Sequence, residues 1–398
     1  EEPAEEEPVA EEGAEEPLED DEQVAAREAL EDARQQAGNE DDAPEEDEDD
    51  SEPPQEGDED EDEQPGSEPE PLGYSDLVGK EGGLTALHYA ARDGYFQAAE
   101  LLLARGADID LPSGDGTSPL LMATVNGNYD LAMRFLAEGA DPMLESEDGA
   151  TPLFATLNNR WAPKSLFPQP TAFKQQETDY LQMMEALIEA GADVNHRTKR
   201  HIWYTSFNFD LLGVDFMGAT PFWRAAYALD VSAMRLLVEN GANPNVPTQK
   251  PASRRFRRGG DSEDKSGLAP VPPGGPAVRP IHAAAGVGYG EGFAANAHRH
   301  VPGAWLPAMR YLVEELGADV NARDHNGYAP VHHAAARGDN TLIEYLVSQG
   351  ADVTVVSRRG QTTVDMANGP VQRITPFPET IALLESLGAK NNNNCVGC

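Results

Sequence analysis

The stretch LLLARGAD at residues 101–108 is the most informative part of the sequence for the fold, because close copies of it follow along the chain. The copies read FLAEGAD, LIEAGAD, LVENGAN, LVEELGAD, LVSQGAD and LLESLGA. The glycines that mark them are Gly106, Gly139, Gly191, Gly241, Gly317, Gly350 and Gly388. Two of the six intervals are 33 residues, and the others (52, 50, 76 and 38) are 33 plus an insertion. A unit that returns at such a period predicts a stacked array.

A second recurring element precedes most of these phrases. It reads GLTALHYAA at 83–91, GTSPLLMAT at 116–124, GATPLFATL at 149–157, GATPFWRAA at 218–226 and GYAPVHHAA at 327–335, with a degraded copy RPIHAAA at 279–285. Together the two elements resemble the ankyrin repeat, a G-x-T-P-L-H-x-A-A helix followed by a second helix and a G-A-D-V-N turn. The resemblance covers about residues 83–389. It implies an all-α solenoid of about seven helix-turn-helix units with β-hairpin-like loops, and protein recognition as the function.

The repeat also makes physical sense from its residue types. Threonine at the predicted first-helix N-cap accepts a backbone hydrogen bond, and proline in the first turn loses no donor that the helix needs. Pairs of alanines let neighbouring helices approach closely, and a glycine can take the left-handed conformation that ends the second helix. The residues concerned are Thr85, Thr151 and Thr220, Pro119, Pro152, Pro221, Pro280 and Pro330, and the pairs Ala90–Ala91, Ala225–Ala226 and Ala334–Ala335.

The net charge of −42 is distributed unevenly. Residues 1–70 hold 35 of the 71 acids against only Arg27 and Arg34. This segment has almost no aromatic or branched residues, so it cannot bury enough apolar surface to offset chain entropy. We therefore expect residues 1–72 to form a disordered acidic region.

The same charge argues against nucleic acid and anionic membrane as partners, because both would repel it. The sequence contains no run of eighteen apolar residues, so it predicts no membrane span. The chain begins at Glu1 without methionine, and its two cysteines do not fix the redox compartment. We expect an exported or periplasmic bacterial protein from which a preceding segment is missing.

We predict three regions: the disordered acidic region over residues 1–72, a repeat domain over 73–390 and a flexible tail over 391–398. The predicted units cover residues 83–111, 116–147, 149–196, 218–246, 279–322, 327–355 and 360–389. Four insertions interrupt them, at residues 158–177, 196–217, 247–279 and 286–305. Insertions that leave a solenoid from its loops cost little stability and often build the recognition surface.

The first, second and fourth insertions and the helix after the second supply the predicted contact residues. Aromatic side chains near basic residues are typical anchors of a protein interface. The second insertion is also strand-like, and its rings either contact a partner or pack against the first insertion. In the fourth unit Trp223 replaces the motif histidine and is followed by Arg224, so it is either a packing plug or an exposed anchor. The predicted partner-binding residues are Trp203, Tyr204, Phe207, Phe209, Trp223 and Arg224, with Trp161 and Trp305 in support.

The third and fourth insertions suggest weaker sites. The basic run Arg254, Arg255, Arg257 and Arg258 could bind phosphate or nucleic acid, form a solvated loop, or attract the acidic residues 1–70 in a salt-sensitive contact. The alternating glycines after Gly286 follow a predicted helix, so they do not form a dinucleotide site. His298 and His300 form an H-x-H pair without an evident third metal ligand, and we predict no metal site.

No residues in the sequence stand out as catalytic. The motif histidines His88, His282 and His332 are expected to hydrogen-bond within the stack. The C-terminal pair Cys395 and Cys398 is the one motif with intrinsic reactivity, and the preceding asparagines suggest a loose tether. We therefore predict a non-enzymatic protein-interaction scaffold without a cofactor. The alternative is a redox or c-type-haem-associated accessory that acts through these two cysteines.

Overall fold

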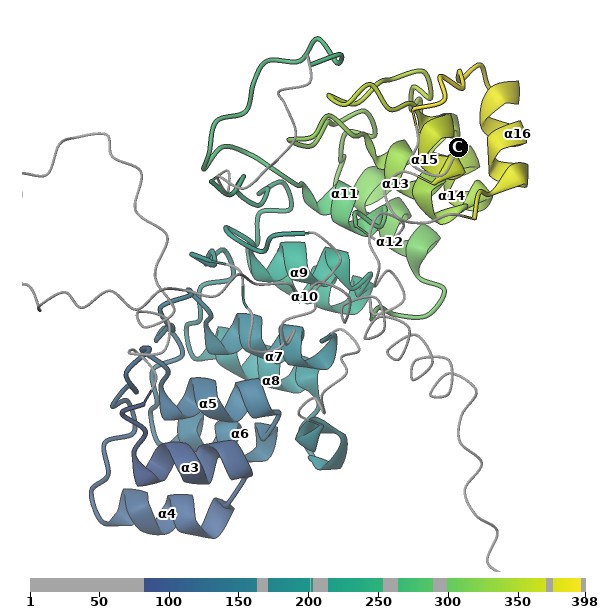
Figure 1. The fold of residues 1–398 in the computed structure, drawn as a ribbon. Coiled ribbons are helices and arrows are strands. Elements are labelled where there is room, and N and C mark those ends of the chain that lie inside the picture. Colours follow the sequence, from purple (N-terminus) through teal and green to yellow (C-terminus); the bar gives the residue numbers. More distant parts are fainter. Residues whose placement is uncertain are drawn as a thin grey trace, which may run out of the picture. The chain divides into compact units, whose positions relative to one another are not determined.

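A computed structural model describes residues 82–162, 171–200, 202, 214–252, 264–288, 299–369 and 375–394. The chain divides into two units, Glu1–Glu70 and Pro71–Cys398, and all the described residues belong to the second. Within them the secondary structure is helical and contains no β-strand, which confirms the predicted fold class (Figure 1). The acidic region 1–72 lies outside the described residues.

The helices follow one another in pairs that match the repeating phrases. The pairs are α3 (Ala86–Asp93) with α4 (Phe96–Ala104), α5 (Pro119–Asn126) with α6 (Tyr129–Ala137), α7 (Pro152–Arg160) with α8 (Tyr180–Glu189), α9 (Pro221–Tyr227) with α10 (Val231–Glu239), α11 (Pro280–Ala284) with α12 (Trp305–Arg310) and its π-helical continuation η3 (Tyr311–Glu315), α13 (Pro330–Arg337) with α14 (Asn340–Ser348), and α15 (Thr363–Asn368) with α16 (Pro378–Ser386). A short 3-10 helix, η1 (Ala172–Gln175), lies in the first insertion.

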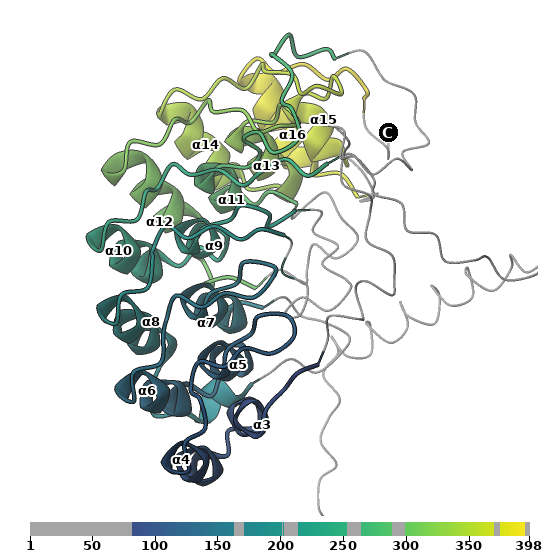
Figure 2. The ribbon, with the colours of Figure 1, turned by 90° about the vertical axis from the view of Figure 1, so that its left-hand side faces the viewer.

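The pairs stack into two layers. The first helices, from α3 through α15, pack in sequence order against one another, and the second helices form a parallel row behind them (Figure 2). A single apolar core runs through the stack from Leu87 to Ala389. The alanine pairs of the first helices are all buried in it, as predicted from their small size.

The first helices begin where the sequence predicts. The hydroxyls of Thr85, Thr151 and Thr220 accept hydrogen bonds from the backbone amide three residues on, and Ser118 does the same for α5. Each predicted proline occupies the first turn of its helix. These contacts fix the point at which each first helix starts.

The glycines of the repeating phrases end the second helices. All seven have φ between 70° and 106°, the left-handed region that side chains disfavour. A Cβ at Gly106 or Gly350 would have no neighbouring atom within 4 Å. The requirement for glycine there is therefore conformational and does not come from crowding.

Between the pairs, each connection makes a tight loop, here called a finger, that is closed by backbone hydrogen bonds. Ser113 N donates to Thr117 O (2.9 Å) in the first finger, and Thr198 N donates to Ala219 O (3.0 Å) in the third. The third finger keeps this closure although the second insertion lies between the two residues. Thr248 N likewise donates to Val278 O (2.9 Å) across the third insertion. Both insertions therefore grow from finger tips and leave the stack intact.

Candidate functional site

One position of the first helices changes its exposure along the stack. It directly follows the motif histidine position and is occupied by Tyr89, Met122, Ala155, Arg224, Ala283, His333 and Met366. Tyr89 is 47% exposed and Met122 is half-buried, whereas the other five residues are at most 2% exposed. The first helices are therefore accessible at this position in the first two units and covered from the third unit onward.

The cover over the central units is a second apolar core built by the ends of two insertions. Ile202, Val214 and Phe216 come from the second insertion and pack with residues of α7, α9 and α11. Ala277 and Val278, at the end of the third insertion, join the same cluster. The two insertions thus return onto the first-helix layer and close it.

Trp223 lies at the centre of this second core and is fully buried. Its indole stacks on Tyr227 at 5.2 Å between centroids, meets the edge of Phe216 at 5.5 Å, and donates through Nε1 to Val278 O at 2.9 Å. The prediction that Trp223 contacts a partner is wrong. It is a packing plug that holds the ends of the insertions on α9.

Arg224 is buried as well, with 1% of its surface exposed. Its Nε donates to Asn158 Oδ1 (2.6 Å) and its Nη2 donates to Trp161 O (2.7 Å), both in the preceding unit. The predicted role of Arg224 as a partner-contacting residue is also wrong, because its hydrogen bonds join the third and fourth units inside the protein.

Trp161, which follows α7, is only 7% exposed and also joins the third unit to the fourth. Its Nε1 donates to Asp230 Oδ2 (2.9 Å), and the same oxygen accepts from Tyr180 Oη (2.7 Å). Asp230 Oδ1 caps α10 by accepting from Ala233 N. Burial, followed by the charge of Asp230, raises the pKa of Tyr180. The supporting prediction of a partner contact at Trp161 is wrong, since this indole joins the third unit to the fourth.

Trp305, the remaining described candidate, is half-buried at the start of α12. The Arg337 guanidinium lies over its ring at 3.4 Å, and the His300 ring packs at 4.7 Å. A Cβ on Gly286 would collide with Arg337 Nε at 2.5 Å, so this close packing requires glycine there. Trp305 keeps some accessible surface and remains a predicted contact residue.

Several predicted residues lie outside the described part of the chain. These are Trp203, Tyr204, Phe207 and Phe209 of the second insertion, the basic run Arg254, Arg255, Arg257 and Arg258, His298, and the terminal Cys395 and Cys398. Their predicted roles, including the contact of the basic run with the acidic region, stay predictions.

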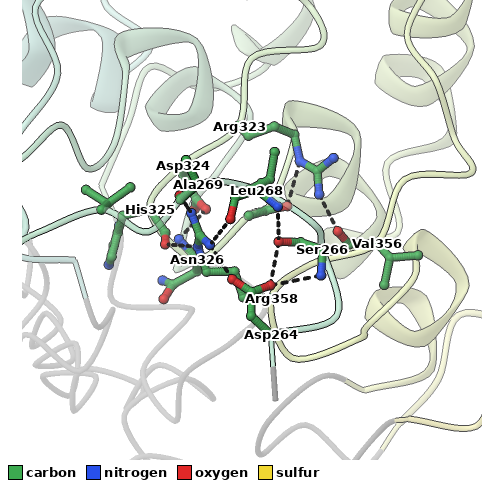
Figure 3. Close-up of polar contacts among 12 residues, drawn as sticks. Asp264, Ser266, Leu268, Ala269, Arg323, Asp324, His325, Asn326, Val356 and Arg358 are labelled. Carbon is green, nitrogen blue, oxygen red and sulfur yellow. Dashed lines mark hydrogen bonds and ion pairs between the residues drawn. The ribbon is translucent and has the colours of Figure 1, made fainter. Parts of the chain in front are cut away.

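Residues 264–269, in the described end of the third insertion, contact the finger two units ahead and are here called the strap (Figure 3). Arg358, in the finger before α15, donates through Nη1 to Leu268 O (3.2 Å), through Nη2 to Ala269 O (2.6 Å) and through Nε to His325 O (2.9 Å). It also pairs with the Asp264 carboxylate. Hydrogen bonds from Ser266, and then the Arg358 charge, hold the pKa of Asp264 at about 2.

The asparagines before the terminal cysteines contact the same finger. Asn392 Nδ2 donates to Gly360 O (2.6 Å), Asn394 Nδ2 donates to Arg359 O (2.7 Å), and Asn394 N donates to Asp365 Oδ1 (3.1 Å). Amide side chains are suited to pairing with the carbonyls of a finger. The flexible tail predicted over residues 391–398 stays a prediction, because its last four residues lie outside the described part of the chain.

Replacing Arg358 by alanine should release the strap. The guanidinium makes four contacts to it and to the neighbouring finger, and hydrogen bonds to charged groups contribute about 1.5–3 kcal/mol each when partly buried. We expect cleavage after Lys265 by a lysine-specific protease to accelerate about tenfold, because local opening exposes the backbone to the protease. Arg359→Ala, at the adjacent exposed arginine, is the matched control. Equal cleavage rates in the two variants would contradict this role.

The motif histidines hydrogen-bond within the stack, as predicted. Thr85 N donates to His88 Nδ1 (3.1 Å), and His88 Nε2 contacts Thr117 O at 2.8 Å. His282 repeats both contacts with Arg279 N (3.2 Å) and Ala322 O (2.9 Å). Because Nδ1 accepts from a backbone amide, Nε2 must carry the proton and the ring must be neutral.

A buried ion pair not expected from the sequence lies beside His282. Asp324 Oδ2 is 3.5 Å from His333 Nε2, and both side chains are buried. Burial by itself would raise the pKa of Asp324, but the hydrogen bond and charge of His333 outweigh burial and hold this pKa at about 2. The pair lies inside the stack and has the character of a structural ion pair.

The described residues include no cluster of three or more His, Cys, Asp or Glu side chains that could hold a metal ion. Among the same residues, no helix is both long and apolar enough to cross a bilayer. A groove of about 440 Å³ lies between residues 244–245, the start of α11 and residues 318–323. Arg323 in its wall already donates to Gly327 O (2.7 Å) and Val356 O.

The accessible apolar side chains are concentrated at the other end of the stack. Of the seven large apolar residues that are exposed in the described part of the chain, six lie between residues 89 and 143: Tyr89, Tyr95, Phe96, Leu101, Leu111 and Met143. This set was not predicted from the sequence, because each residue is of an ordinary type for its helix or finger. The signal that could have found it is position, since the first unit has no earlier copy of the motif to cover it.

A family model described as ankyrin repeats (3 copies) matches residues 87–198, and one described as ankyrin repeats (many copies) matches residues 297–347. The chain is an ankyrin-repeat protein. Ankyrin repeats are in general protein–protein interaction modules, and neither matching model describes a catalytic domain.

Similar curated proteins share only short stretches with this ankyrin-repeat protein. It is 33% identical over 61 residues to the ADP-ribosylation factor GTPase-activating protein AGD2 of Arabidopsis thaliana, covering 15% of this chain and 8% of that protein. It is 40% identical over 52 residues to human ankyrin repeat domain-containing protein 49, covering 13% and 22%, respectively. It is 30% identical over 86 residues to bovine ankyrin repeat domain-containing protein 37, covering 21% and 54%.

Among solved structures, the human ASB11 ankyrin repeat domain matches 76% of this ankyrin-repeat protein and 98% of that domain, with 19% sequence identity and a TM-score of 0.45. The chain spans less than a third of the first curated relatives that it matches.

Proposed function

We propose that this ankyrin-repeat protein is a non-enzymatic scaffold that binds a protein partner. The observation that carries the proposal is the change in exposure along the first-helix layer, from Tyr89 at 47% to Ala155 at 2%. The third and later units bury this position, so the accessible part of the layer belongs to the first two units. An accessible aromatic residue on a rigid helix is the type of anchor that dominates protein interfaces.

The stack supports the proposal because it fixes the contact surface before a partner arrives. Contacts such as that of Arg224 with Asn158, and of Asp230 with Trp161, join successive units. A surface held in this way loses little conformational entropy on binding. The aromatic residues of the second insertion, with Trp305, are the further proposed contacts, whereas Trp223, Arg224 and Trp161 are structural.

Partner capture from a lysate of the source organism, followed by mass spectrometry, tests the proposal. The baits are the full chain, a chain without residues 203–213, and a Tyr89→Ala chain. The deletion spares the backbone bonds that close the third finger. We expect a protein that is enriched by the full chain and lost, by about tenfold or more, with at least one of the altered baits, which is the effect of removing an interface anchor.

A chain without residues 253–263 is the matched control, because this deletion has the same length and also removes part of a finger insertion. The control should retain the partner. If all four baits recover the same proteins at the same level, the chain is a spacer and the proposed binding surface is wrong.

A further inference from the structure

The first unit exposes side chains at positions that every later unit buries. Ala98 lies eight residues before the glycine that ends its helix, and it is exposed. The residues at the same position in the later second helices are 0–2% exposed: Leu131, Met183, Ala233, Met309, Leu342 and Thr380. Ala86 shows the same contrast with Pro119 and Pro330 in the first helices. The outer side of α3 and α4 is therefore a stacking surface that no unit in the described part of the chain covers.

This surface is unusually apolar for the end of a solenoid. Tyr95 is 62% exposed, Leu101 56% and Phe96 38%. Terminal units of soluble solenoids generally carry a polar outer side, because an apolar one leads to association. We call the exposed set Ala86, Tyr89, Tyr95, Phe96, Ala98 and Leu101 the N-terminal face.

The surroundings of the N-terminal face are negatively charged. Residues 82–150 hold eleven Asp and Glu against three Lys and Arg, whereas residues 151–398 hold 23 of each. Two of the three arginines are already paired, Arg92 with Asp93 (2.8 Å) and Arg134 with Glu138 (2.6 Å). The net negative charge of residues 82–398 is thus concentrated in the first two units.

The fingers beside the face place some of this charge next to apolar residues. Asp108 and Asp110 precede the exposed Leu111, and Asp141 precedes the exposed Met143. Asp110 Oδ1 accepts from Asp141 N at 2.9 Å, so the two fingers are joined at these acidic residues. An apolar surface bordered by carboxylates is complementary to a segment with apolar and positively charged side chains.

We propose that the N-terminal face binds a cationic amphipathic segment of a partner protein. The proposal rests on the scaffold function above and adds the chemistry of the partner. Apolar side chains of that segment cover Tyr95, Phe96 and Leu101, and its lysines or arginines lie against the finger carboxylates. The same charge disfavours nucleic acid and anionic lipid at this face.

The test uses the full chain and a helical model peptide of leucine and lysine, in which photoreactive leucines mark the contact. A twin peptide carries glutamate in place of lysine. After irradiation, the adducts are mapped by mass spectrometry. We expect adducts of the lysine peptide on residues 86–111 and few adducts of the glutamate twin.

Matched variants then separate the apolar and electrostatic parts by fluorescence polarisation. Leu101→Ser should weaken binding of the lysine peptide about tenfold, which is a typical loss for an apolar anchor, whereas Leu387→Ser, at another exposed leucine, should not. Asp108→Asn with Asp141→Asn keeps the Oδ1 atoms that accept from Asp110 N and Met143 N. This pair should weaken binding at least about threefold at low salt and less at high salt.

Asp319→Asn with Asp352→Asn is the control for the charges, because these residues make the same turn contact in distant fingers. Adducts confined to residues 1–70, equal labelling by both peptides, or equal loss in the control pair would overturn the proposal. So would a dimer of the chain that is abolished by Leu101→Ser, since the occupant would then be a second copy. If a partner is captured and lost on deletion of residues 203–213, but the lysine peptide does not label the N-terminal face, the scaffold function stands and only the proposed role of this face is overturned.

Discussion

Replacing Trp223 by alanine should lower the free energy of unfolding by about 3–5 kcal/mol, the range typical of a buried aromatic residue truncated in a core. The indole is fully buried, stacks on Tyr227 and donates to Val278 O. Its loss leaves a cavity between α9 and the ends of two insertions, so the cost includes both lost burial and the cavity. Urea unfolding followed by circular dichroism measures the change.

Tyr89→Ala is the control for Trp223→Ala, because Tyr89 is an aromatic residue at the neighbouring motif position of the first unit with 47% exposure. Its loss should change the unfolding free energy by less than about 1 kcal/mol, as for other exposed positions. An exposed anchor would behave in the opposite way and lose binding with its stability intact. If Trp223→Ala unfolds at the same urea concentration as the unaltered chain, the plug assigned to Trp223 is wrong.

The parts of the fold that could be predicted from sequence are those that depend on neighbours in the chain. Thr85 caps α3 three residues ahead, and Gly106 ends α4 through its own backbone conformation. Such contacts recur with the motif. The period of 33 residues therefore predicted the helix pairs, their order and their stacking. The fold class and the roles of the motif histidines followed from the same signal.

The buried roles of Trp223, Arg224 and Trp161 could not be predicted because they depend on where an insertion returns. Arg224 meets Asn158 and Trp161 O, 66 and 63 residues away, and no repeat places an insertion end against it. An aromatic residue next to a basic residue occurs both in protein cores and in interfaces, so this pattern in the sequence does not distinguish the two. Exposure decided between these alternatives, and exposure here is set by long-range packing.

The exposed N-terminal face was missed for the opposite reason. Most residues at the Ala98 position in the later units are apolar and all are buried, whereas the Leu101 position holds Arg134 in the second unit, so residue type does not mark the pair as exposed. Whether such a residue is buried depends on the unit before it, and the described first unit has none. Counting the copies from the N-terminal side identifies the first unit of the stack. The exposure of its outer side could therefore have been predicted from the place of the unit, although the residue types did not indicate it.

Acid should destabilise the stack through its buried neutral histidines. Burial lowers the pKa of His282 to about 4 and that of His332 to about 3, below the ordinary value of 6.5. The unfolded chain therefore binds these protons first as the pH falls. Stability contributed by the neutral rings is complete above pH 6.5 and is lost as the pH falls through that value toward the folded-state pKa. Each histidine adds a slope of about 1.4 kcal/mol per pH unit in this window.

Urea unfolding at several pH values between about 7 and 4.5 measures this slope. His282→Gln should remove the contribution of one histidine, because the glutamine amide stays neutral while it can still accept from Arg279 N and donate to Ala322 O. The carboxyl of Asp324, with a pKa of about 2, titrates below the window and leaves the comparison clear. A variant with the same slope as the unaltered chain would show that folding does not lower the pKa of His282, so that its ring is protonated in the fold over most of this window. In that case Nδ1 could not accept from Arg279 N, and the hydrogen-bonding pattern that joins α11 to the following finger would have to differ from the one described.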